Sequence, residues 1–285
     1  MTLIFWLGCT LPTHKESLDL ICLLDNGQIF EARFTKGDTG LYKGQAHLRV
    51  NRWSAQGTPM SFHLDIPPPV SEIDEEGADF WGQRIYIQND IWQIHIRSEE
   101  YNVSGQLSNS NNTLKTHNDN WSFEVLQPNG TIMGWSSALG RSGMLKGSCA
   151  LFRRHGHAHL KNERHTILAF GTDNHIGIEY NSIIKQSWGL LNNQNMNDEQ
   201  FTLHMQPTHI EGSISGAPYL FTPNKILGQE DLYDHLTSIE RNIGSLMVSL
   251  SSRHITYGTV TAQGITLPAV HIYYGDNPLV LKKDE

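Results

Sequence analysis

The chain has 285 residues, with 29 acidic and 21 basic side chains and a formal net charge of -8 at pH 7. This balance argues against nucleic acid as a partner, because binding to phosphates needs concentrated lysine and arginine. Charged residues make up only 18% of the chain and glycines number 25. Such a composition is more typical of a β protein than of a helical bundle. The length predicts two domains or one large all-β domain.

Apolar stretches, the N-terminal sequence and the cysteines indicate in which cellular compartment the protein resides. No apolar stretch approaches the roughly 18 residues that a membrane-spanning helix needs, so no transmembrane segment is expected. The run Met1–Cys9 has no basic residue before its apolar part, and we interpret it as a first β-strand rather than a secretory signal. The three cysteines cannot all pair internally, and Cys9, Cys22 and Cys149 are interpreted as buried thiols in a reducing cell. These features together predict a cytoplasmic protein.

Short alternating strands separated by tight turns dominate the first half. An Asn26-Gly27 pair between the β-rich runs Leu18–Leu24 and Gln28–Phe34 predicts a hairpin. Apolar and polar residues then alternate over 46–51 and 60–66, and Pro67 ends the second of these strands because proline cannot donate to a ladder. Further strands are predicted over 84–88, 91–97 and 101–107, and a further hairpin over 121–132 with its turn at Pro128-Asn129-Gly130. The polar, Asn-rich segments 108–120 and 192–198 are interpreted as loops.

The second half is also predicted to be mostly strands. They cover 145–152, 166–170, 176–184, 201–205, 246–250, 254–261 and 269–274. One helix is predicted over Gln229–Ile243, because Leu232, Leu236 and Ile239 fall at helical spacing and Gly244 follows as a cap. Roughly fourteen short strands and about one helix indicate antiparallel β architecture, arranged as two barrels or two sandwiches. A barrel of about eight strands has room for one small ligand.

Several features between residues 17 and 107, with a short aromatic strand before them, occur in a distinctive order. They are Phe5-Trp6, the Asp25-Asn26-Gly27 hairpin, a long hairpin, Pro67-Pro68-Pro69, Gly77-Ala78-Asp79-Phe80-Trp81 and Tyr101-Asn102-Val103-Ser104-Gly105. In this order they resemble the tandem lipocalin-like group that includes AttH-type proteins, carotenoid hydratases and lipocalin-fold Diels–Alderases. The resemblance covers about a third of the chain.

This resemblance implies an all-β fold of two lipocalin-like antiparallel β-barrels in tandem, with one or two short helices. The first barrel would span residues 1–160 and the second 161–285. It also implies an apolar small-molecule ligand and hydration or cyclisation of isoprenoid or polyketide substrates without a cofactor. Many members carry the signature Gly-aromatic-x-Asp-His-x-Trp-Gly. The nearest string here is Phe170–Gly177, where Asp173 and His175 are no longer adjacent and the Trp is missing.

The strand over 174–183 holds the candidate catalytic residues Glu179, His175 and Asp173. Alternation places His175 and Glu179 on one face, where they could exchange protons with a substrate if that face points into a barrel. Burial would raise the pKa of Glu179 and make it a general acid. Replacement of Glu179 by Gln is then expected to impair function and spare the fold. The alternative is an ordinary strand whose polar face lies in water.

The remaining candidates are a binding set and a metal set. Ligand-lining side chains are expected at Trp121, Trp135, Tyr180, Trp188, Tyr219 and Arg141. Alternatively, these aromatic residues are plain core and Arg141 is a solvated loop residue. His157, His159 and Glu163 have the spacing of a cupin metal motif, within a cluster that runs from His155 to His165. Four nearby basic residues oppose cation binding, which favours a solvated basic loop, and no metal is expected.

Three functions therefore remain open from the sequence. The first is a cofactor-independent cyclase, isomerase or hydratase that acts on an apolar small molecule in a barrel. The second is a non-catalytic carrier of the same kind of ligand, and the third is a cupin-like metal enzyme. The sequence favours the first, and it leaves the substrate and the oligomeric state open.

Overall fold

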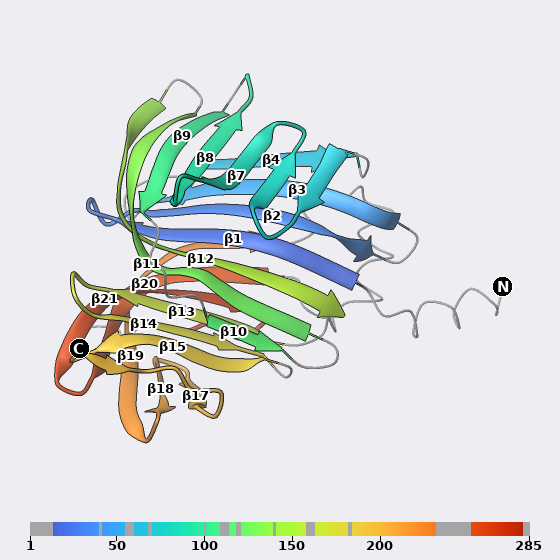
Figure 1. Cartoon of the computed structure of the whole chain (residues 1–285). Helices are drawn as coiled ribbons and strands as arrows, with labels where there is room; N and C mark the ends of the chain where they lie inside the picture. The colour runs from blue at the N-terminus through green and yellow to red at the C-terminus, as the bar shows by residue number, and fades with distance from the viewer. Residues whose placement is uncertain are drawn as a thin grey trace, which may run out of the picture. The chain divides into compact units, whose positions relative to one another are not determined.

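The computed structural model describes residues 14–39, 42–54, 60–67, 70–99, 101–108, 114–117, 121–138, 141–157, 163–181, 184–231 and 252–281. Within these ranges the extended elements are antiparallel strands in two sheets (Figure 1). The described residues divide into two compact units, one ending at residue 158 and one beginning at residue 159. Each unit carries one sheet with an apolar core on one face.

The first unit is a twelve-stranded sheet with the order β4-β3-β2-β1-β12-β11-β9-β8-β7-β6-β5, and β10 pairs with β11. Its strands are β1 (His14–Leu24), β2 (Ile29–Thr39), β3 (Tyr42–Trp53), β4 (Met60–Ile66), β5 (Ser71–Ile73), β6 (Gly77–Phe80), β7 (Gln83–Gln88), β8 (Ile91–Arg97), β9 (Tyr101–Ser108), β10 (Leu114–His117), β11 (Trp121–Ala138) and β12 (Arg141–His157). The Phe34 ring in β2 lies 5.1 Å from the Phe80 ring in β6, so strands distant in the sheet order face one core.

Alternation along the strands fills that core as the sequence predicts. Leu18 and Leu20 in β1 are fully buried in it, as are Leu48 and Val50 in β3. Turns separate the strands where expected, since β1 ends before the Asn26-Gly27 turn and β4 ends before Pro67. The Asn-rich segment 108–120 departs from the expected loop, because residues 114–117 pair with β11 as β10.

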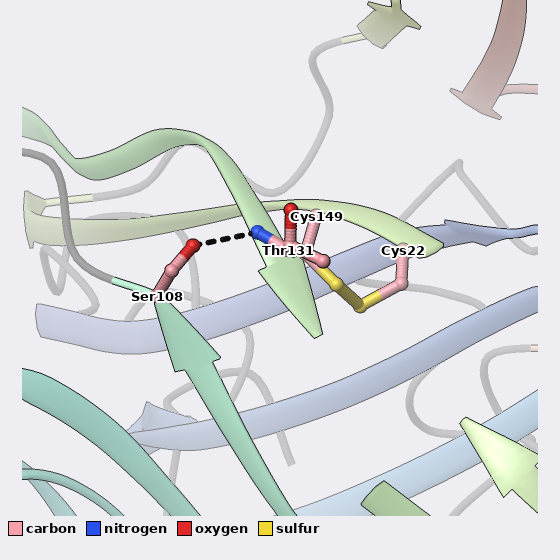
Figure 2. The surroundings of a disulfide bond; sticks show 4 residues. All are labelled: Cys22, Ser108, Thr131 and Cys149. Carbon is pink, nitrogen blue, oxygen red and sulfur yellow. Dashed lines mark hydrogen bonds between the residues drawn. A yellow bond between two sulfur atoms is a disulfide. The ribbon is translucent and has the colours of Figure 1, made fainter. Parts of the chain in front are cut away.

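The cysteines differ from the expectation of reduced thiols. Cys22 in β1 and Cys149 in β12 lie directly opposite each other, with Cα atoms 4.0 Å apart, and form a disulfide inside the core (Figure 2). Close by, the backbone N–H of Thr131 donates to Ser108 Oγ at 2.8 Å. A disulfide is typical of proteins that fold in an oxidising compartment. The pairing therefore overturns the interpretation of Cys22 and Cys149 as free thiols, and Cys9 lies outside the described residues. The cytoplasmic location stays a prediction.

The second unit is a nine-stranded sheet with the order β16-β15-β14-β13-β21-β20-β19-β18-β17. Its strands are β13 (Arg164–Phe170), β14 (His175–Tyr180), β15 (Lys185–Leu191), β16 (Gln194–Asn195), β17 (Thr202–Gln206), β18 (His209–Ile214), β19 (Ala217–Asp231), β20 (Ser252–Ala262) and β21 (Ile265–Tyr274). One face carries an apolar core that includes Ile167, Ile178 and Phe221. We call this the inner face of the second sheet.

The predicted helix over 229–243 begins in a strand instead. Residues 229–231 extend β19 and pair with His254, Arg253 and Ser252 of β20, because the ladder satisfies their backbone groups. The rest of that helix, the predicted strand 246–250 and the predicted first strand lie outside the described residues. No helix in the described ranges is long and apolar enough to cross a membrane. The expected all-β fold with two antiparallel β units in tandem is confirmed.

Candidate functional site

Buried histidines and tyrosines gather at one end of the inner face of the second sheet. They occupy positions where β13 begins, where β14 and β21 end and where β20 begins. Sheet register brings them together, since His165 pairs with Tyr273, which in turn pairs with His254. We call His165, His254, His271 and Tyr273 the histidine–tyrosine cluster.

His165 and His271 form a hydrogen-bonded pair, with Nδ1 of the first 3.2 Å from Nε2 of the second. Their rings stack with centroids 5.4 Å apart and planes 13° from parallel. Burial lowers the pKa of His165 from 6.5 to about 4. Burial also lowers the pKa of His271 well below 6.5, and the neighbouring histidines lower it further. Both imidazoles are therefore neutral at pH 7, and one donates its N–H to the other.

His271 also keeps an unused polar atom. Its Nδ1 is buried and has no hydrogen-bond partner among the described residues. The Phe221 ring, part of the apolar core, lies 5.4 Å from the His271 ring. A buried polar atom without a partner costs free energy, and such atoms concentrate where a ligand or water completes the bonding.

Tyr273 links the cluster to an exposed carboxylate. Its hydroxyl donates to Glu163 Oε1 at 3.0 Å, and its ring lies 4.8 Å from the His165 ring and 5.9 Å from the His254 ring. Burial is the main cause that raises the pKa of Tyr273 to about 12, and the hydrogen bond and charge of Glu163 add to it. The phenol is therefore protonated at neutral pH and can donate a hydrogen bond. His254 in turn bonds the Gly275 carbonyl oxygen through Nε2 at 3.1 Å.

A second polar group lies among the core residues of the first unit. Arg52 donates to Ser136 Oγ at 2.9 Å and to Gln28 Oε1 at 2.6 Å. Nearby Tyr101 stacks on Phe62, with ring centroids 5.6 Å apart, and its buried hydroxyl has no partner among the described residues. Burial raises the pKa of Tyr101, although the Arg52 charge opposes the rise. This pair can bind a polar group of an otherwise apolar ligand, but it contains no base.

The predicted catalytic residue Glu179 lies on the face opposite the histidine–tyrosine cluster. It is fully buried, Thr166 Oγ1 donates to its Oε2 at 2.6 Å, and Arg164 Nε lies 3.7 Å from its Oε1. Ile178 on the same strand contributes to the inner core. The sheet therefore separates Glu179 from the cluster.

The other two predicted catalytic residues lie away from Glu179. His175 begins β14, and burial lowers its pKa to about 4. Between it and Glu179 lies Gly177, where an added Cβ would be only 2.0 Å from the Trp188 indole. Asp173 is exposed in the turn before β14. The structure thus places these three side chains along one stretch of chain without bringing them into contact.

The predicted ligand-lining residues fall in different environments. Trp121 and Trp188 are buried, whereas Trp135 is 51% exposed. Tyr219 is buried in the second core and its hydroxyl donates to the Thr202 carbonyl oxygen at 3.1 Å. Tyr180 lies nearest the cluster, with its ring 5.9 Å from that of His165. Arg141 begins β12, and its side chain is outside the described residues.

Of the three residues of the predicted cupin-like metal motif, only Glu163 has a side chain among the described residues. Glu163 accepts the hydrogen bond from Tyr273 described above. His157 ends β12 with a side chain that lies outside the described residues, and His159 is outside them altogether. His155 is 49% exposed and its Nε2 lies 3.2 Å from Glu16 Oε1. The metal hypothesis therefore stays a prediction.

Sequence reasoning did not identify the pairing of His165 with His271 and Tyr273. His165 is counted in the cupin-like cluster, although it belongs to the strand that follows. The alternation of His271 and Tyr273 along the predicted strand 269–274 is a signal that they share a face. Nothing in the sequence, however, states that β13 and β21 are neighbours.

Comparisons with known proteins identify the fold. No protein-family model matches the chain, and no curated protein matches it. A crystal structure described as an AttH protein from Nitrosomonas europaea matches with a TM-score of 0.67 and 9% identity, over 94% of this chain and 93% of that one. Kievitone hydratase from Nectria haematococca matches with a TM-score of 0.52 and 9% identity, over 91% of this chain and 87% of that one. The chain therefore has the tandem lipocalin-like all-β fold that these two structures share.

Proposed function

We propose that the protein is a cofactor-independent hydratase or isomerase that acts on an apolar small molecule at the inner face of the second sheet. The observation that carries the proposal is the histidine–tyrosine cluster, which joins a neutral buried base to a buried acid. The fold supports it, because one protein of this fold is named as a hydratase. No metal or cofactor is invoked.

His271 supplies the base in this proposal. Its Nδ1 has no partner among the described residues, and its Nε2 is occupied by His165. When water or a substrate hydroxyl binds at Nδ1, the imidazole accepts its proton, and the second histidine orients the ring and shares the charge that develops. The apolar surroundings strengthen this hydrogen bond, because the local dielectric is lower than in water.

Tyr273 supplies the acid. In the structure its single O–H donates to Glu163 Oε1 at 3.0 Å. When substrate binds, rotation about the phenolic C–O bond turns that proton toward the carbon or oxygen that gains it. In a hydration, the O–H bond of water breaks, its oxygen bonds to one alkene carbon and the tyrosine proton reaches the other. The proton taken by the histidine returns to the phenolate through solvent, so atoms and charges balance. In an isomerisation, the same two groups remove and return one proton.

The test compares two tyrosines that are adjacent on β21. The protein is incubated with a panel of apolar isoprenoids and polyketides that includes kievitone, and products are identified by mass spectrometry as a gain of one water or as an isomer. Tyr273→Phe removes one hydroxyl from the cluster. Tyr274→Phe is the matched control, because it removes a buried hydroxyl from the opposite face.

We expect Tyr273→Phe to lower the turnover rate about a hundredfold, a typical contribution of a general acid, and Tyr274→Phe to leave it unchanged. His271→Gln should also abolish turnover, since an amide does not accept a proton at neutral pH. Equal rates in Tyr273→Phe and the wild type would remove the cluster from the mechanism.

A carrier is the second candidate, because the first unit has a large apolar core with Arg52 and Tyr101 as its polar pair. A carrier would bind compounds of the same panel without converting them. Tyr101→Phe would then change affinity, whereas Tyr273→Phe would have no effect.

A further inference from the structure

A second group of titratable side chains lies on the first sheet, away from the histidine–tyrosine cluster. His47 is on β3, and His63 and Asp65 are on the neighbouring strand β4. Their neighbours Ala46, Leu48 and Leu64 belong to or pack on the apolar core, so alternation places these three side chains on the opposite face. The His47, Asp65 and His63 side chains are 27%, 63% and 25% exposed.

The donor atoms of these residues converge. His47 Nδ1 lies 2.6 Å from Asp65 Oδ1, and His63 Nε2 lies 2.7 Å from the same oxygen. One donor atom from each residue falls within 4.8 Å of the other two. Backbone pairing fixes this convergence, because His47 is directly opposite Asp65 in the ladder and His63 precedes it by two residues on the same face.

We propose that His47, His63 and Asp65 bind a divalent transition-metal ion such as Zn²⁺ or Fe²⁺, with water completing the coordination. Two imidazole nitrogens and one carboxylate oxygen on one side of an ion form a facial triad, which suits these metals and leaves open positions. The partial exposure of all three side chains gives water access to those positions. With neutral histidines the three ligands carry one negative charge, which favours a cation.

Binding replaces the present hydrogen bonds. A metal-bound imidazole nitrogen carries no proton, so the hydrogens that now bridge each histidine to Asp65 are released or move to the other ring nitrogen. Asp65 Oδ1 and each histidine nitrogen then move apart by a few tenths of an ångström, so that each can lie about 2.0–2.2 Å from the ion, the usual metal–ligand distance. Rotation about side-chain bonds is sufficient for this, because the backbone already holds the three residues together.

Two cations near the site limit its affinity. Arg49 Nη2 lies 3.3 Å from His63 Nδ1. Burial is the main cause that lowers the pKa of His47, and the nearby Lys15 charge adds to it, while Asp65 acts in the opposite direction. A guanidinium bonded to Nδ1 favours the His63 tautomer with a proton on Nε2, the atom that must bind the metal. Arg49→Gln removes this charge and offers a carbonyl oxygen that can accept an N–H from Nδ1. It should therefore tighten metal binding.

The test is calorimetric titration of the full chain with Zn²⁺, with the visible absorption of bound Co²⁺ as a second readout. His47→Asn, His63→Asn and Asp65→Asn are each compared with His209→Asn. His209 is a matched control because its Nε2 lies 3.8 Å from Glu211, a histidine–carboxylate pair outside the triad. Urea unfolding without metal checks that each variant is folded.

We expect each of the three variants to lose one Zn²⁺ equivalent, or at least tenfold in affinity, and to lose the Co²⁺ absorption. The control should match the wild type, and Arg49→Gln should bind several-fold more tightly. Two results would overturn the proposal: a wild type that binds no Zn²⁺, or triad variants that bind as the wild type does. Zinc bound elsewhere, for example by the histidines at 155–165, would persist in all variants and is thereby distinguished.

Discussion

The disulfide between Cys22 and Cys149 gives the most quantitative prediction. The two residues are 127 apart in sequence, so the cross-link closes a large loop in the unfolded chain. The loop-entropy relation gives about 5 kcal/mol of stabilisation at 25 °C for a loop of this length. This is a large share of the stability of a typical domain, which is about 5–15 kcal/mol.

The assay compares oxidised and reduced protein in urea on a Cys9→Ser background, which prevents exchange with the third cysteine. Unfolding is followed by tryptophan fluorescence, to which the buried Trp92 of the same core contributes. With a typical slope of about 2 kcal/mol per molar urea, reduction should lower the midpoint by about 2.5 M. The Cys22→Ala/Cys149→Ala variant should unfold early whether or not reductant is present.

Two results would refute this reasoning. Alkylation of both cysteines in unreduced, unfolded protein would show that the bond does not form. A midpoint that reduction leaves unchanged, with cleavage verified by mass spectrometry, would show that the loop constraint contributes nothing to stability. Formation of the bond only in oxidising expression hosts would, in contrast, agree with an oxidising compartment.

Three further predictions concern buried titratable side chains. Asp19 is fully buried and forms ion pairs with Arg33 and Arg154. Asp19→Ala should therefore lower the free energy of unfolding, measured in urea, by about 3–5 kcal/mol. A loss below about 1 kcal/mol would contradict a buried ion pair. The pKa of His165 is about 4 in the folded state and 6.5 in the unfolded state, so acid favours the unfolded state. The contribution of neutral His165 to the free energy of unfolding is therefore complete above pH 6.5, and about 3 kcal/mol of it is lost as the pH falls to 4. A His165→Phe variant should lack this pH dependence, and an unchanged profile would assign it to other groups. If the chemistry is on the inner face, Glu179→Gln should have a turnover rate within about twofold of the wild type. A loss of turnover as large as that of Tyr273→Phe would show that Glu179 takes part in catalysis.

Much of the fold could be predicted because alternation and turn residues are local signals. Leu48 is buried and His47 lies on the other face, as the period of two requires. The helix prediction failed at Gln229 because a period of 3.6 in a short apolar pattern is weaker than a backbone ladder with a neighbouring strand. That neighbour, β20, begins 23 residues after Gln229, so the sequence window that suggests the helix does not contain it.

The candidate site could be predicted less well, because it depends on which strands are neighbours. His165 and His271 are 106 residues apart, and only the order β13-β21-β20 brings them within hydrogen-bond distance. The same reason hid the disulfide, whose cysteines meet through the pairing of β1 with β12. For Glu179, alternation predicted the shared face with His175 but could not state which face of the sheet points inward.

The central claim is that an apolar ligand meets the histidine–tyrosine cluster. A crystal structure of the protein with the panel compound that it binds most tightly tests this directly. We predict ligand density on the inner face of the second sheet, with a polar atom within hydrogen-bond distance of His271 Nδ1 and of the Tyr273 hydroxyl. Density confined to the first unit, against Arg52 and Tyr101, would contradict the claim and favour the carrier.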